Sequence, residues 1–182
     1  MAGVEFGMTL WGRAWLRIVE RISSAPSPKL PNARRLARGI DDAIRVESGL
    51  ITAVIETNSV EIAVPLWTEN ELATVEEKLS SSNVRGAGGD LPDALVEDVK
   101  TAGVDIACEL DRLQVTCTCR SRTDKCVHVF AAIYGAVLAI DQQPTRAVIV
   151  RSPRRESGRT LIDSDWIALE DIEVGPFFAL PR

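Results

Sequence analysis

The segment 117–142, CTCRSRTDKCVHVFAAIYGAVLAIDQ, decides how this chain is interpreted, because it opens with three of the four cysteines and the only histidine. These residues, Cys117, Cys119, Cys126 and His128, have the spacing C-x-C-x6-C-x-H. Zn²⁺ favours four thiolate or imidazole ligands in a tetrahedron, and three cysteines with one histidine are a standard structural set. The segment therefore predicts one zinc site with these four residues as its ligands.

The spacing also predicts how the chain folds around the site. Cys117 and Cys119 close the apolar-polar alternation of LQVTCTC, so in a strand their side chains point to the same face. Cys126 and His128 stand at the start of a helix-like run, VHVFAAIYGAVLAI. In mid-helix they would point nearly opposite ways, so we expect Cys126 just before the helix and His128 in its first turn. The polar linker RSRTDK is short enough to bring the two pairs together.

Other roles are open to these residues. They could be ordinary buried side chains, or a disulfide cluster, which requires an oxidising compartment. The N-terminal sequence MAGVEFGMTLWGRAW predicts no secretory signal, and a reducing cytoplasm favours metal over disulfide. Cys126 could also be a nucleophile with His128 as its base, although a nucleophile rarely stands beside two more cysteines. Cys108, on a strand expected in VDIACELDRLQV, is interpreted as a small buried hydrophobe outside the site.

Composition places the chain among globular proteins, with 46% apolar and 26% charged residues. No apolar run is long enough to span a membrane, so we expect a cytoplasmic protein with no membrane partner. Residues 112–160 hold nine basic and three acidic side chains. A nucleic-acid face, if present, would consist of Arg120, Arg122, Lys125, Arg151, Arg154, Arg155 and Arg159. The alternative is a solvated turn and a flexible basic linker, because a chain of net charge −5 lacks a broad basic surface.

Periodicity predicts the elements before the site. TLWGRAWLRIVERIS is an amphipathic helix with Thr9 as N-cap, and its Trp11 and Trp15 pack in the core or form a partner patch. SAPSPKLPNARRLARG carries three prolines and predicts a loop. Three β-like runs, GIDDAIRVES, LITAVIETN and SVEIAVPLW, predict an antiparallel meander. Helices follow in TENELATVEEKLSSS, from Thr68, and in LPDALVEDVKTAG, which Gly103 closes.

These elements predict an α+β fold with an N-terminal helix, an antiparallel β-meander, helices, and a β-turn/helix zinc finger with an extended C-terminal tail. We divide the chain into an N-terminal α+β region (1–103), the finger (104–142), and a basic linker with an acidic-aromatic tail (143–182). Residues 161–182 either dock their aromatic side chains on a partner or fold back on the core. The single histidine is a ligand already, and no phosphate-binding loop is present, so we expect no catalytic residues and no small-molecule substrate.

The spacing C-x-C-x6-C-x-H resembles the SWIM zinc finger. The start of the chain is also similar to that of bacterial SWIM zinc-finger proteins, in Phe6, Gly7, Trp11, Gly12, Arg13, Ala14 and Trp15, and the similarity covers roughly residues 5–140. The resemblance implies that the domain holds zinc and binds DNA or other proteins, and bacterial relatives are often associated with Swi/Snf-type helicases. The loop RSRTDK departs from the family, whose finger often carries an aromatic residue or proline shortly after the second cysteine.

We therefore expect a non-enzymatic adaptor, in which zinc stabilises the finger and orients a surface for a protein partner such as a Swi/Snf-type helicase. Direct DNA binding by the basic finger and the following linker is the second hypothesis, and it predicts an affinity that falls steeply with salt. An enzyme with a cysteine nucleophile is the third.

Overall fold

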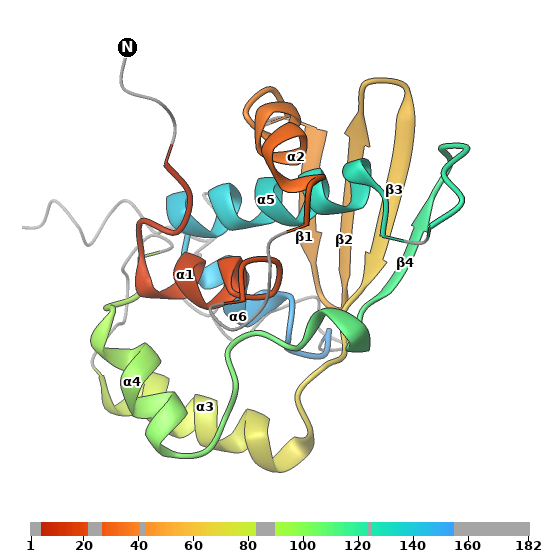
Figure 1. Cartoon of the computed structure of the whole chain (residues 1–182). Helices are drawn as coiled ribbons and strands as arrows, with labels where there is room; N and C mark the ends of the chain where they lie inside the picture. Colours follow the sequence, from red (N-terminus) through yellow and green to blue (C-terminus); the bar gives the residue numbers. More distant parts are fainter. Residues whose placement is uncertain (1–4, 22–26, 41–42, 83–89, 124, 155–182) are drawn as a thin grey trace, which may run out of the picture.

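The computed structural model of the chain describes residues 5–21, 27–40, 43–82, 90–123 and 125–154. Within these residues, six α-helices pack with a four-stranded antiparallel sheet in the order β1-β2-β3-β4 (Figure 1). The predicted α+β fold is therefore confirmed.

The sheet combines the predicted meander with a strand from the cysteine-rich segment. Its strands are β1 (Ile44–Glu47), β2 (Leu50–Ile55), β3 (Asn58–Ala63) and β4 (Gln114–Cys117). β4 is antiparallel to β3, with Cys117 opposite Val60. Because Val60 points to the buried face of the sheet, Cys117 does so too. The residues 104–142 thus complete a sheet that begins far earlier in the chain.

Helix α5 (Val127–Gln142) crosses the buried face of the sheet and forms the middle of the core (Figure 1). Every residue from Val129 to Ile140 is buried. The helix contacts all four strands on one side, and it also contacts α1 (Leu10–Leu16), α2 (Leu30–Ala37) and α6 (Thr145–Ile149). A helix that is apolar all round is stable only when protein surrounds it, and these neighbours provide that cover.

Helix α1 is attached to the end of α5 through one carboxylate. Asp141 accepts hydrogen bonds from the backbone N–H of Gly7 (2.7 Å), from that of Thr9 (2.9 Å) and from the Thr9 hydroxyl (3.0 Å). The Thr9 hydroxyl in turn accepts from the N–H of Gly12 at 2.9 Å, as an N-cap does, which confirms its predicted role. A Cβ atom on Gly12 would lie 2.0 Å from Asp141 Oδ1, so only glycine fits there.

The two tryptophans of α1 belong to the core. Trp11 and Trp15 are both fully buried, which confirms core packing, so these two side chains form no exposed patch for a partner. The motif that resembles the start of SWIM proteins therefore has a structural explanation in this chain. Its tryptophans fill the core, and its glycines let the backbone approach Asp141.

The loop predicted for SAPSPKLPNARRLARG is wrong in part, because its second half forms α2. Pro31 lies in the first turn of the helix, where a missing N–H breaks no intrahelical hydrogen bond. Leu30, Ala33 and Ala37 are buried at helical spacing, and α2 packs on α5. Pro31 therefore stands at the start of a helix, whereas the run of prolines predicted a loop.

The two predicted acidic helices are confirmed as α3 (Glu69–Ser81) and α4 (Ala94–Thr101), which pack together at the side away from the sheet (Figure 1). Thr68 and Glu71 form a capping box at the start of α3. Gly103, with φ +83°, ends α4 in the left-handed region that favours glycine.

The strand predicted for VDIACELDRLQVTC is wrong in its first part. Residues 104–109 form no strand, a 3₁₀ turn η2 (Leu110–Arg112) follows, and only β4 joins the sheet. Ile106 and Cys108 are buried as predicted, because the extended chain passes along the core. Alternating burial therefore arises here without the strand-to-strand hydrogen bonds that define a sheet.

Part of the segment expected to be a basic linker is folded. It contains α6, and the residues that follow α6 are bonded to the rest of the protein. The N–H of Trp67 donates to the Arg151 carbonyl at 2.8 Å, and the Ser48 hydroxyl donates to the Ser152 carbonyl at 2.6 Å. The predicted tail at 161–182 lies outside the described residues, and the division into three regions stays a prediction.

Replacing Gly12 with alanine tests the attachment of α1 to α5. We expect Gly12→Ala to lower the free energy of unfolding by about 2–3 kcal/mol, because the new methyl group displaces the Asp141 carboxylate. This loss outweighs the gain of about 1 kcal/mol that alanine brings to a helix interior. Urea denaturation measures the difference. Gly39→Ala is the matched control, since its Cβ would meet only the Leu36 carbonyl at 3.8 Å. Equal stability of the two variants would contradict this account.

Candidate metal centre

The four predicted ligands come together where β4 ends and α5 begins. Cys117 is the last residue of β4, and Cys119 follows two residues later. Cys126 is the N-cap of α5 with an extended backbone (φ −81°, ψ 173°), and its side chain makes no capping hydrogen bond. His128 lies in the first turn of the helix, so both residues stand where the sequence predicted them.

The geometry of the cluster fits one metal ion. The four ligand atoms all lie within 4.8 Å of one another. Nδ1 of His128 is 3.9 Å from Sγ of Cys117 and 4.0 Å from Sγ of Cys126. In a tetrahedral zinc site, a sulfur and a nitrogen ligand are about 3.6 Å apart. The observed distances exceed this value by a few tenths of an ångström, a difference that small side-chain rotations remove.

The chemistry of the donors is also that of a metal site. All four cysteines of the chain are free thiols, so no disulfide cluster is present. Cys108 is buried and stands outside the group of ligand atoms. Thiolate and imidazole donors suit zinc and other soft or borderline ions, whereas magnesium and calcium require oxygen ligands. The residues present therefore fit a zinc ion.

The thiols differ in how readily they lose a proton. Burial raises the pKa of Cys117 to about 12. A hydrogen bond with His128 is the main cause that lowers the pKa of Cys119 to about 6. At neutral pH, Cys119 is therefore largely a thiolate, while Cys117 keeps its proton until a cation compensates its charge.

Glu56 is a neighbour of the cluster that the sequence analysis missed. Its Oε2 atom lies 3.6 Å from Nε2 of His128, an ion-pair distance that is slightly long for a hydrogen bond. Glu56 stands in the turn between β2 and β3, with φ +56°. Metal-binding histidines commonly direct their second nitrogen at a carboxylate, which fixes the ring with its other nitrogen free for the metal. Glu56 is placed to do this for Nδ1 of His128.

The loop between the two ligand pairs is held on both sides. The ammonium group of Lys29, just before α2, donates to the Thr123 hydroxyl (2.8 Å) and to the Lys125 carbonyl (2.9 Å). The Lys125 side chain forms an ion pair with Asp111. These contacts fix the loop next to the cluster. They also neutralise the charge of Lys125, one of the basic residues of the loop.

The basic face considered from the sequence is smaller than expected. Arg120, Arg122 and Arg154 are exposed, and no ion pair engages them within the described part of the chain. Arg151 is buried and cannot belong to a surface that contacts nucleic acid, so its assignment to that face is wrong. Arg155 and Arg159 lie outside the described residues.

No family model, no curated protein and no solved structure matches the chain. Among the helices of the described residues, none is both long and apolar enough to span a bilayer.

The role of Glu56 can be tested on metal affinity. We expect Glu56→Asn to weaken zinc binding about tenfold, because asparagine tolerates the left-handed backbone but withdraws the carboxylate from His128. Competition against a chromophoric chelator measures the affinity. Glu61→Gln, on the exposed face of β3, is the control and should bind zinc like the wild type. An unchanged affinity in Glu56→Asn would show that His128 needs no orienting carboxylate.

Proposed function

We propose that this chain is a cytoplasmic zinc-binding interaction protein, in which a SWIM-type zinc finger is structural and supports recruitment of a protein partner in a DNA-related setting. The observation that carries the proposal is the meeting of three cysteines and one histidine at the junction of β4 and α5. The SWIM assignment rests on the C-x-C-x6-C-x-H spacing of these ligands and on the tryptophan-rich start of the chain.

A structural role for the metal follows from the number of ligands. Four protein ligands leave no coordination position for a water molecule or a substrate, which metal-assisted hydrolysis would require. The cluster also contains the only histidine of the chain, so no second imidazole is present to act as a base. Both points support a protein that is not an enzyme.

The position of the site explains what a structural metal would do. It would join the last strand of the sheet to the first turn of the central helix, two elements that the loop 118–126 connects. Metal binding in such small units supplies part of the folding free energy. The fixed loop then presents Arg120 and Arg122 to solvent next to the finger.

The resemblance to bacterial SWIM proteins implies a partner of the Swi/Snf helicase type. Direct DNA binding is the alternative, and the exposure of Arg120 and Arg122 favours it. Two further basic residues of the predicted face do not support DNA binding, because Lys125 is paired with Asp111 and Arg151 is buried. A protein partner therefore remains the first choice.

The two functions predict that different molecules co-purify with the chain through its exposed loop. We expect a defined protein to co-purify in a stoichiometric amount with the wild type from its native host after nuclease treatment. Arg120→Ala with Arg122→Ala should reduce its recovery about tenfold, because the charges that orient the partner are lost, without changing the zinc content. Quantitative mass spectrometry measures recovery.

The control is Arg35→Ala with Arg45→Ala, two exposed arginines on α2 and β1. It should retain the partner. Recovery of nucleic acid alone, with an affinity that falls steeply as salt rises, would contradict the adaptor proposal and establish DNA binding.

A further inference from the structure

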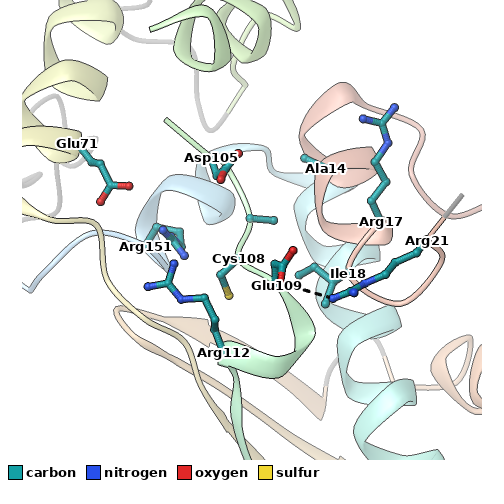
Figure 2. A pocket seen from close by; sticks show the side chains of 11 residues that line it. Ala14, Arg17, Ile18, Arg21, Glu71, Asp105, Cys108, Glu109, Arg112 and Arg151 are labelled. Carbon is teal, nitrogen blue, oxygen red and sulfur yellow. Dashed lines mark ion pairs between the residues drawn. The ribbon is translucent and has the colours of Figure 1, made fainter. Parts of the chain in front are cut away.

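A second group of charged side chains surrounds a cavity of about 470 Å³ that contains none of the four metal ligands (Figure 2). The cavity lies between α1, the segment from residue 105 to η2, and the end of α6. Four arginines line it, namely Arg17, Arg21, Arg112 and Arg151. Three of them are exposed, while Arg151 is buried.

Arg151 is the unusual member of the group. Its exposed fraction is only 3%, and its Nε and Nη1 atoms have no hydrogen-bond acceptor within the described residues. Its guanidinium lies over the ring of Trp67, with Cζ 5.6 Å from the ring centroid. The ring compensates part of the charge. The Trp67 ring lies over the face of the guanidinium group, so it accepts no hydrogen bond from the N–H groups, which point outward in the guanidinium plane. Buried guanidinium groups are otherwise found with anions.

Three carboxylates, those of Glu71, Asp105 and Glu109, also line the cavity, and none of them forms an ion pair with Arg151. The carboxylate of Glu71 accepts from the N–H and from the hydroxyl of Thr68, both at 2.8 Å, and is thereby held in the capping box of α3. Glu109 lies 3.9 Å from Arg21. Burial lowers the pKa of Arg151, while the nearby Cys108 and the negative charge of Glu71 act in the opposite direction and Arg112 adds a smaller lowering effect. Arg151 thus makes no ion pair at contact distance within the described residues, and its charge lies near that of Arg112.

We propose that this cavity binds a small phosphate monoester, with Arg151 at its base and Arg112 at its rim as the principal ligands. Figure 2 shows these two side chains reaching the same region from different elements, beside Cys108. Guanidinium groups from several directions suit the three oxygens of a phosphate better than the two of a planar carboxylate. The volume suits an organic phosphate of metabolite size rather than a bare ion.

This site is independent of the zinc finger. The protein would bind and release the ligand at this site without changing it chemically. Trp67 links the base of the cavity to the core, because it packs under Arg151 and donates from Nε1 to the Asp105 carbonyl at 3.0 Å. An anion on Arg151 would therefore stabilise the segment that joins α4 to η2.

Phenyl phosphate and benzoate are matched probes, which differ in the anionic group. The test uses the full zinc-loaded chain at constant ionic strength, with calorimetric titration for affinity and thermal unfolding for stability. We expect saturable binding of phenyl phosphate, a rise in the unfolding temperature, and much weaker binding of benzoate. Arg112→Ala, at an exposed position, should weaken binding about tenfold or more. Arg35→Ala is the control and should bind like the wild type.

A second variant separates ligand binding from folding. Arg151→Met should abolish binding and leave the unfolding temperature without ligand equal or higher, because an unpaired buried charge is removed. The proposal is overturned if phenyl phosphate does not saturate, if benzoate binds equally well, or if Arg112→Ala binds normally. Zinc content, measured in the same samples, shows separately whether the finger is intact.

Discussion

The burial of helix α5 is the constraint on which the rest of this structure depends. Its residues from Val129 to Ile140 are covered on every side, by the sheet and by the helices α1, α2 and α6. The two ends of the helix are fixed by polar contacts of different kinds. Asp141 binds the backbone of α1 at one end, and the cluster of Cys126 and His128 with Cys117 and Cys119 lies at the other. The core positions the helix, and these contacts fix one end relative to α1 and the other end relative to β4.

A metal centre makes physical sense at this place because β4 is a short edge strand that no hairpin connects to its neighbour β3. It has four residues, lies at an edge, and pairs only with β3. A metal that joins Cys117 on this strand to His128 on α5 replaces the contacts that such a short strand cannot provide by itself. It would also compensate the negative charge of the Cys117 thiolate, since burial otherwise keeps this thiol protonated. A metal bound here and the fold would therefore support each other, and such a structural role needs no open coordination position.

The elements that the sequence predicted well are those with local signals. A capping threonine marks the starts of α1 and α3, a terminal glycine marks the end of α4, and alternation marks the meander. The end of the first helix was predicted wrongly, because α1 stops at Leu16 and residues 17–19 form turns. The ligand positions also follow from local spacing. The errors arise where one local pattern has two physical origins. Proline occurs at the start of a helix as well as after its end, so the prolines led to a loop prediction where α2 forms. Alternating burial also occurs in an extended segment that makes no strand-to-strand hydrogen bonds, so a strand was wrongly predicted before η2. Glu56 and Arg151 had no local signal, because tertiary packing alone brings them to His128 and to Trp67.

X-ray absorption spectroscopy at the zinc edge, on protein purified from cells without added metal, tests the central claim most directly. The account predicts one zinc per chain, with three sulfur ligands at about 2.3 Å and one nitrogen ligand at about 2.0 Å. It also predicts that Cys126→Ser loses this signal together with the ordered junction of β4 and α5. Protein that is fully folded without stoichiometric metal, or a zinc shell that contains oxygen from solvent, would contradict a closed structural site.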